Sequence, residues 1–207
     1  MPNLEYECQL GFPNVRVAGV DEVGRGCIAG PVVAGAVILP SCIDFDQDPW
    51  LHEVDDSKKM SAEQRDRIAP LIYRWASSVA IGVASVEEID QINIFHASHL
   101  ALVRAACALG VVPSHVLVDG KFLPKKGFPA PATAVIKGDQ KCLSIAAASI
   151  VAKVWRDAYM LELDRQFPAY GFSQHKGYPT PQHARALKAV GISAVHRRSF
   201  KTVSALA

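Results

Sequence analysis

Near its start the chain carries the stretch Val17-Ala18-Gly19-Val20-Asp21-Glu22-Val23-Gly24-Arg25-Gly26. The apolar run from Val15 to Val20 is typical of a buried strand. Two adjacent carboxylates at its end are costly to bury unless a cation or hydrogen bonds compensate them. The glycines allow the backbone to approach a ligand closely, and the arginine between them suits a phosphate. We therefore interpret the stretch as part of a metal-dependent site that handles a phosphodiester.

Two other interpretations of this stretch have to be weighed. An Asp-Glu pair after a strand is often the start of a solvated loop. A Gly-x-Gly turn after a strand is also found in dinucleotide-binding proteins. Here the spacing Gly24-x-Gly26-x-x-x-Gly30 is one residue too long, and two acids occupy the place of a pyrophosphate. A dinucleotide site is therefore disfavoured.

The bulk composition allows a single domain with a sizeable core. The chain has 207 residues, half of them hydrophobic, and this length suits one domain. Its 22 Lys and Arg against 20 Asp and Glu give a formal net charge of +2. That is a weak tilt toward anionic partners, far from the strongly basic surface of a histone.

The cysteines and the apolar runs indicate a cellular compartment. Five cysteines are scattered without a C-x-x-C motif, so we predict reduced thiols packed in or near the core. No apolar run reaches membrane-spanning length, and the N-terminus has neither a basic leader nor a signal-peptide core. The sequence thus predicts a cytoplasmic protein that does not contact a membrane.

Local patterns predict alternating strands and helices. A second apolar run, residues 31–39, follows the glycine turn closely, which favours an antiparallel hairpin. Capping boxes at Ser61 and Ser85 begin helices that we expect to reach about Trp75 and Leu109. Asn93 lies early in the second helix and could face the active-site end. Further strands are predicted at 78–85 and 132–136, and further helices at 143–167 and 181–190.

Two more acids follow predicted strands. Residues 116–118 form an apolar run that ends at Asp119, and the helix before it makes a β-α-β unit, so this strand should be parallel to an earlier one. If it lies beside the first strand, the carboxylates of Asp21 and Asp119 converge at one sheet edge, within reach of a shared divalent ion. Asp139 follows the next strand in the same way. By contrast, Asp157 is more simply explained by an i, i+4 ion pair with Lys153.

Three polar segments each have a structural and a functional interpretation. The cluster at 55–59 is either a solvated loop or a phosphate contact through the hydroxyl of Ser57 and the two ammonium groups of Lys58 and Lys59. The glycine-bounded loop at 171–180 is either a surface turn or a ligand contact. The basic segment at 196–201 is either a solvated end or a strip that binds a nucleic-acid backbone.

Taken together, these segments resemble the bacterial ribonuclease HII family, the type 2 ribonucleases H. The likeness spans about Val17 to Phe200. Five stretches carry it, in this order: residues 19–26, 56–59, 118–120, 137–139 with 144–154, and 175–178. Each stretch alone is weak evidence, whereas all five in sequence are specific.

The resemblance implies an RNase H-like α/β fold with a central five-stranded mixed sheet flanked by helices and a helical C-terminal part. It implies a single catalytic domain in which about residues 168–207 form an extension that contributes to substrate binding. The implied catalytic and metal-binding acids are Asp21, Glu22, Asp119 and Asp139. The implied substrate-binding residues are Gly24, Arg25 and Gly26 at the ribonucleotide and its 2′-hydroxyl, Tyr178 on the sugar after the RNA–DNA junction, and Lys58 and Lys176.

The activity implied by the resemblance is endonucleolytic. The enzyme would hydrolyse the RNA strand of RNA–DNA hybrids and cut 5′ to single ribonucleotides in duplex DNA, leaving 3′-hydroxyl and 5′-phosphate ends. Carboxylate-rich sites suit Mg²⁺ or Mn²⁺, and two such ions are expected. The implied roles are ribonucleotide removal and RNA primer processing, by a monomer. The alternatives are another RNase H-like nuclease, such as a resolvase or an integrase-type core, and a non-catalytic nucleic-acid-binding module.

Overall fold

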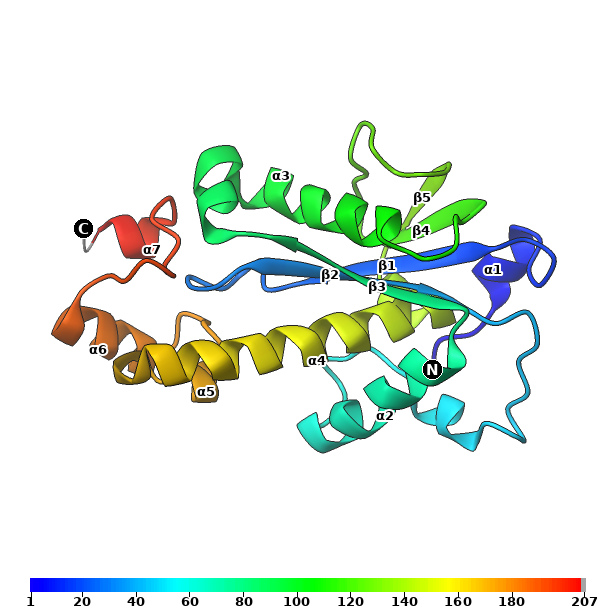
Figure 1. Ribbon diagram of the computed structural model, residues 1–207, viewed down its shortest axis with the longest axis horizontal. Coiled ribbons are helices and arrows are strands. Elements are labelled where there is room, and N and C mark those ends of the chain that lie inside the picture. Colours follow the sequence, from blue (N-terminus) through cyan, green and yellow to red (C-terminus); the bar gives the residue numbers. More distant parts are fainter. Residues whose placement is uncertain (206–207) are drawn as a thin grey trace.

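The computed structural model describes residues 1–205 and is built on a five-stranded mixed sheet with the order β3-β2-β1-β4-β5 (Figure 1). β1 is antiparallel to β2 and parallel to β4, as the hairpin and β-α-β patterns predicted. The strands are β1 (Val17–Val23), β2 (Val32–Ile38), β3 (Ser78–Ala84), β4 (His115–Asp119) and β5 (Ala132–Val135).

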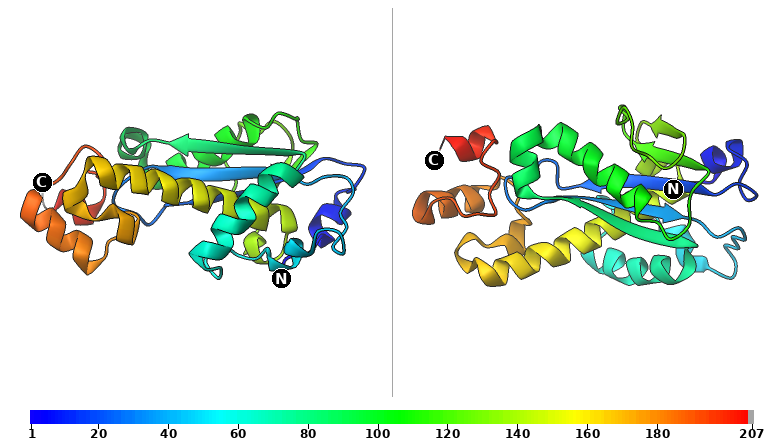
Figure 2. Two further views of the ribbon diagram at one scale, coloured as in Figure 1. Left: turned by 60° about the horizontal axis from the view of Figure 1, so that its bottom comes forward. Right: turned by 45° about the horizontal axis from the view of Figure 1, so that its top comes forward.

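Helices cover both faces of the sheet. The α-helices are α1 (Glu5–Gln9), α2 (Ala62–Trp75), α3 (Val86–Cys107), α4 (Leu143–Gln166), α5 (Phe172–His175), α6 (Pro181–Val190) and α7 (Lys201–Ser204). Short 3-10 turns are η1 (Pro49–Glu53), η2 (Gly138–Gln140) and η3 (Pro168–Tyr170). α3 packs on one face, whereas α2 and α4 pack on the other (Figures 1 and 2). The predicted α/β fold is confirmed.

Small residues let α4 lie directly against the two central strands. Residues 143–152 of α4 are buried without exception. A Cβ on Gly19 of β1 would stand 2.2 Å from the Ser144 carbonyl carbon, and one on Gly35 of β2 would stand 2.4 Å from the Ala148 oxygen. Any side chain at these two positions would push the helix off the sheet. The close contact fixes α4 relative to the end of β1, where the acids are.

Two predicted elements differ from the structure. β1 extends to Val23 because Glu22 and Val23 pair with Ala34 and Val33 of β2, so the acids lie within the strand and do not follow it. α3 is interrupted at Asn93, which has a left-handed φ of 63°. The Asn93 side-chain oxygen accepts hydrogen bonds from the next turn's backbone, as an N-cap does. Asn93 therefore caps the second segment of α3, and it does not lie within a continuous first part of the helix as predicted.

The C-terminal segment folds around the turn between β1 and β2. The Gly30 amide donates to Val195, and the Arg197 amide donates to Ile28. His196 and Arg197 are fully buried there. For these two residues both interpretations of the basic segment, a solvated end and a backbone-binding strip, are wrong, because both side chains are enclosed by the protein.

The cysteines and the surface complete the description. All five thiols are free as predicted, but Cys8, Cys42 and Cys107 are exposed and not in the core.

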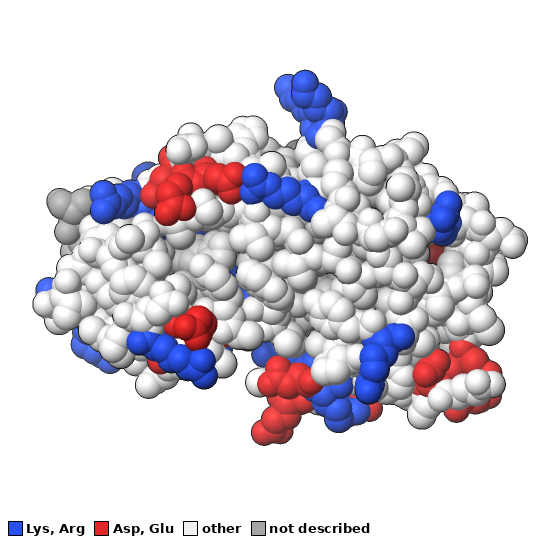
Figure 3. All heavy atoms as spheres, viewed as in Figure 1, with Lys and Arg blue, Asp and Glu red and all other residues white. Residues whose placement is uncertain are grey.

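None of the helices within residues 1–205 is long and apolar enough to cross a membrane. On the face shown in Figure 3, charged side chains gather toward the edges and leave the middle largely uncharged. Basic side chains project where the β4–β5 loop stands in Figure 1.

Candidate active site

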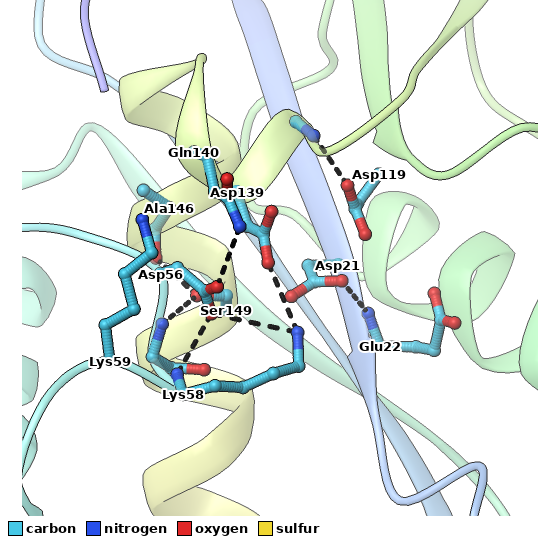
Figure 4. A network of polar contacts seen from close by, with 12 residues as sticks. Asp21, Glu22, Asp56, Lys58, Lys59, Asp119, Asp139, Gln140, Ala146 and Ser149 are labelled. Atoms are coloured by element: carbon cyan, nitrogen blue, oxygen red, sulfur yellow. Dashed lines mark hydrogen bonds and ion pairs between the residues drawn. The ribbon is translucent and has the colours of Figure 1, made fainter. Parts of the chain in front are cut away.

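The two acids of β1 leave the strand on opposite faces. Alternation places Ala18, Val20 and Glu22 on the α3 side and Gly19 and Asp21 on the α4 side. Figure 4 shows the two carboxylates diverging from the strand. The Asp21 carboxylate is held close to the backbone, because its Oδ1 accepts a 2.8 Å hydrogen bond from the Glu22 amide. The acids thus flank the strand without pointing at one spot.

Asp119 reaches the same place from the neighbouring strand. Because Val20 is paired with Val118, Asp119 stands beside Asp21 at the end of the two parallel strands. Its Oδ1 accepts a 2.7 Å hydrogen bond from the Gly138 amide. Gly138 follows Lys137, whose left-handed φ of 56° turns the chain after β5. This turn brings Asp139 toward the acids of β1 and β4 (Figure 4).

Lys58 lies against this group of acids. Its ammonium is 3.2 Å from Asp139 Oδ2 and 3.7 Å from Asp56 Oδ1. Asp56 and Ser57 are buried, and the Ser57 amide donates to Ser149 Oγ of α4 at 3.3 Å. The solvated-loop interpretation is therefore wrong for Asp56 and Ser57, whereas the side chain of Lys58 is 72% exposed even though its ammonium lies against the acids.

Burial and mutual repulsion make the acids hold protons more tightly than usual. Burial, followed by the charges of Glu22 and Asp119, raises the pKa of Asp21 well above its ordinary value, against the opposing effect of Lys58. Burial also raises the pKa of Glu22 and of Asp139. In turn, the acids outweigh the effect of burial on Lys58 and raise the pKa of its ammonium. The cluster is a concentration of negative potential that cations relieve.

A pocket of about 460 Å³ opens over these groups. It is lined by Asp21, Glu22, Val23, Gly24, Arg25, Gly26, Ser57, Lys58, Arg65, Asp119, Lys153 and Tyr178. Eight of the ten predicted site residues are among them. Asp139 borders the pocket through its contact with Lys58. Lys176 is directed elsewhere, because its ammonium donates to the Ser173 carbonyl oxygen.

Two buried arginines support the glycine turn from behind. Arg156 donates to the carbonyl oxygens of Pro31, Lys176 and Ala29 at 3.0, 2.9 and 3.1 Å. Arg197 donates to the carbonyl oxygens of Gly30 and Arg25. Neither guanidinium forms an ion pair with a carboxylate within the described residues, so both bring net positive charge behind the pocket. Sequence patterns could not show this, because the acceptors are backbone atoms.

Gly24 has to be glycine in this arrangement. Its φ is +93°, and an added Cβ would lie 2.3 Å from Nε of Arg156. Its neighbour Arg25 turns outward and donates to Glu22 Oε1 at 3.0 Å. The Tyr178 ring lies on the other side of the turn, with its Cε1 3.9 Å from the position of a Cβ on Gly26. The turn and the ring thus form one continuous wall of the pocket.

Sequence reasoning missed two cations of the pocket. Arg65 of α2 and Lys153 of α4 both approach Asp157, at 3.9 and 2.8 Å. The predicted ion pair between Lys153 and Asp157 is confirmed. The i, i+4 spacing signalled that pair but not its place beside the pocket. Arg65 had no signal, since it stands in an ordinary amphipathic helix.

The residues fit a hard divalent cation in donor chemistry and in charge. Carboxylate oxygens are the ligands that Mg²⁺ and Mn²⁺ prefer, and the charges of Glu22, Asp119 and Asp139 add to the effect of burial in raising the pKa of Asp21. Within residues 1–205, no three acidic, histidine or cysteine side chains form a ready-made metal centre. Arg25 and Lys58 instead hold Glu22 and Asp139.

Comparison with known proteins places this pocket in a family. The family model described as ribonuclease HII matches residues 18–203. The chain is 50% identical over 204 residues to a ribonuclease HII of Ruegeria pomeroyi, covering 98% of this chain and 83% of the relative. It is 54% identical over 189 residues to one of Nitrosococcus oceani, covering 91% and 90%. The chain belongs to the ribonuclease HII family. It is therefore a ribonuclease H, an endonuclease that acts on RNA–DNA hybrids.

The fold agrees with this assignment. The crystal structure of the ribonuclease H2 from Pyrococcus horikoshii superposes with a TM-score of 0.74 at 28% identity, over 92% of this chain and 96% of that one. The family resemblance predicted from the five sequence stretches is confirmed, and so is the RNase H fold.

Proposed function

We propose that this ribonuclease H also cuts 5′ to single ribonucleotides embedded in duplex DNA, and that it leaves 3′-hydroxyl and 5′-phosphate ends. One observation carries the proposal: the Gly24-Arg25-Gly26 turn and the Tyr178 ring form one wall of the pocket whose floor holds Asp21 and Asp119. A wall that recognises a sugar thus stands beside a floor that hydrolyses a phosphodiester. The cellular roles that fit this activity are ribonucleotide removal and RNA primer processing.

The floor would hold the metal ions. We assign Asp21, Glu22, Asp119 and Asp139 as ligands, because their charges act on one another at one end of the sheet and their oxygens are of the type that hard cations prefer. A pair of Mg²⁺ or Mn²⁺ ions would supply an activated water and charge stabilisation for the leaving oxygen. Without metal ions, Arg25 pairs with Glu22 and Lys58 pairs with Asp139. When these acids bind metal ions instead, the two cations become free to contact the substrate backbone.

The wall would distinguish RNA from DNA. A 2′-hydroxyl is both a donor and an acceptor, and it is what separates a ribonucleotide from a deoxyribonucleotide. The glycine turn can offer backbone amides and carbonyls to it without side chains in the way. Its carbonyl groups are fixed from behind, since the guanidinium of Arg197 binds the Arg25 oxygen at 3.1 Å. The segment after residue 168 takes part in substrate binding through Tyr178, and we retain Lys176 as a candidate contact.

The decisive experiment is metal-dependent cleavage of a DNA duplex with one embedded ribonucleotide, mapped to the nucleotide. We expect a single cut on the 5′ side of the ribonucleotide and no cut in the all-DNA duplex. A long RNA–DNA hybrid serves as the positive control for ribonuclease H activity. Equal cutting of the all-DNA duplex would indicate a different RNase H-like nuclease. Binding without cutting in the presence of Mg²⁺ or Mn²⁺ would indicate a non-catalytic module.

Tyr178 is expected to act on cleavage more than on binding. Its ring is 40% exposed over the pocket, so Tyr178→Ala removes a contact to one sugar while most backbone contacts persist. We expect kcat/KM at the embedded ribonucleotide to fall by about tenfold or more, and duplex binding to change by less than about threefold. Tyr73→Ala, at a tyrosine that is 48% exposed outside the pocket, is the control. Equal losses in cleavage and binding would remove the proposed sugar contact.

A further inference from the structure

Three histidines are buried together beneath the segment that carries Tyr178. They are His175 at the end of α5, His183 in α6 and His196 beyond α6, and each is at most 7% exposed. The rings of His175 and His183 are stacked, with centroids 4.3 Å apart. His183 Nε2 is 3.0 Å from His196 Nε2. The rings form a compact polar cluster inside an otherwise apolar core.

The partners of His183 and His196 determine where their protons lie. His183 Nδ1 is 3.0 Å from the Tyr178 carbonyl oxygen, which can only accept, so Nδ1 carries the hydrogen. In a neutral ring the Nε2 of His183 is then an acceptor, and His196 Nε2 donates to it. His196 Nδ1 is left as an acceptor, and it faces the Ser193 amide at 3.2 Å and the Ser193 hydroxyl at 2.8 Å. A chain of hydrogen bonds, in which each group donates to the next, thus runs from Ser193 through His196 and His183 to the carbonyl oxygen of Tyr178.

His175 holds Gly177, the residue before Tyr178, and its proton position also follows from its hydrogen-bond partners. Its Nε2 is 2.9 Å from the Tyr170 carbonyl oxygen and therefore donates. Its Nδ1 accepts a hydrogen bond from the Gly177 amide at 3.2 Å. Gly177 in turn accepts from the Ile28 amide at the β1–β2 turn. The neutral form of each ring satisfies every partner in the cluster.

We propose that His175, His183 and His196 are positioning residues that hold the Tyr178 ring against the substrate sugar, and that they do so only as neutral imidazoles. A proton added to His183 would set two N–H groups of His183 and His196 against each other. A proton added to His196 at Nδ1 would oppose the Ser193 amide. Protonation of either ring therefore breaks the chain of hydrogen bonds that ends on the Tyr178 carbonyl oxygen. The inference rests on the proposed function of Tyr178 as a sugar contact.

The surroundings favour the neutral forms of His183 and His196. Burial, together with the neighbouring imidazoles, lowers the pKa of both His183 and His196 to about 4. Phe172 and Tyr170 are the other rings in contact with them. The nearby cations are bonded elsewhere: Lys176 to the Ser173 carbonyl, Arg197 to the Gly30 carbonyl and Arg156 to the Lys176 carbonyl. The nearby acid is Asp164 of α4, which lies by the backbone of Phe172 and Ser173 and whose Oδ1 is buried without a hydrogen-bond partner among the described residues. The buried Cys27 thiol donates to the Lys176 carbonyl.

Nitrogen NMR of the imidazoles in the full-length protein tests the proton positions directly. At neutral pH we expect His183 to be the Nδ1–H tautomer, and His175 and His196 to be Nε2–H tautomers. On acidification we expect the Tyr178 ring signals to shift at the same midpoint as His183 and His196, well below the ordinary histidine value. An Nε2–H tautomer for His183, or Tyr178 signals that ignore the titration, would overturn the proposal.

Substitutions at His183 test the function of the chain. His183→Phe keeps the stacked ring but removes both nitrogens, and we expect kcat/KM at an embedded ribonucleotide to fall about tenfold. His183→Asn restores an N–H near the position of Nδ1 and should recover part of the loss. His52→Phe, at an exposed histidine far from the cluster, should leave the rate unchanged. Thermal melting of each variant identifies any that fails to fold.

A double-mutant cycle separates positioning from general structure. If His183 acts through the Tyr178 ring, His183→Phe should have no further effect on kcat/KM in a Tyr178→Ala background. A full, additive loss in that background would overturn the proposal. A wild-type enzyme that does not cut at the embedded ribonucleotide would instead contradict the proposed function, whereas an intact wild type with a fully active His183→Phe would contradict this inference alone.

Discussion

Asp119→Asn is expected to reduce cleavage of RNA–DNA hybrids at least about a thousandfold while the fold persists. The substitution removes a negative charge from the floor of the pocket but keeps an oxygen that can accept from the Gly138 amide, as Asp119 Oδ1 does at 2.7 Å. The turn after β5 should therefore stay in place. The measurement is the steady-state rate with saturating Mg²⁺ or Mn²⁺, together with circular dichroism and thermal melting.

Asp157→Asn is the matched control for this experiment. Asp157 is an acid of α4 that pairs with Lys153 and is not one of the four assigned ligands. We expect its loss to change the rate by less than about tenfold, since a partly exposed i, i+4 pair contributes little. An Asp119→Asn enzyme with near-normal metal-dependent turnover would refute the metal assignment, whatever the control shows.

Asp21→Asn is expected to abolish cleavage and, in the absence of metal, to make the protein more stable. Asp21 is buried among acids that raise its pKa, so its charge is unfavourable in the folded state at neutral pH. Each unit of a raised pKa corresponds to about 1.4 kcal/mol. We therefore expect the variant to melt at least about 2 °C above the wild type in EDTA. Added Mg²⁺ should stabilise the wild type more than the variant, which lacks one ligand.

The gain in melting temperature of the Asp21→Asn variant should increase with pH. A carboxyl whose pKa is raised on folding binds its proton more tightly in the folded state than in the unfolded state, so stability falls as pH rises above the ordinary value of 3.8. The difference in melting temperature between Asp21→Asn and wild type should thus be small near that pH and grow toward neutrality. Asp46→Asn, at an exposed acid, is the control. A pH-independent difference would show that ionisation of the buried Asp21 carboxyl is not its cause.

Much of the site could be predicted because its acids are tied to strand ends. Alternating strands and helices made the strand before Asp119 parallel to an earlier strand, and parallel neighbours bring their carboxyl ends to one edge. The capping boxes at Ser61 and Ser85 both form, and they begin α2 and α3 where expected. These signals are local in sequence, so a single sequence contains them.

The features that the sequence did not predict depend on contacts between residues that are far apart along the chain. The end of β1 was misplaced because Glu22 and Val23 are kept in the strand by pairing with β2, and polar residues in a strand resemble a loop. Glu7 carries no signal for burial in the sequence, yet it is buried, and its carboxylate accepts hydrogen bonds from the amide and hydroxyl of Ser144. His196 and Arg197 looked like surface residues because polar side chains are usually found at the surface. Arg197 donates to the backbone carbonyls of Gly30 and Arg25, and His196 bonds to the ring of His183, and neither arrangement leaves a pattern in the sequence.

Arg197 binds a carbonyl that precedes it by 172 positions. Without that guanidinium, the oxygens of Arg25 and Gly30 would be left without their partner, at a cost of about 1–3 kcal/mol for each buried group. The sheet and α4 are complete well before residue 197. The hydrogen bond that fixes the turn beside the acids therefore joins two segments that are far apart along the chain, and it can form only after residue 197 has been synthesised.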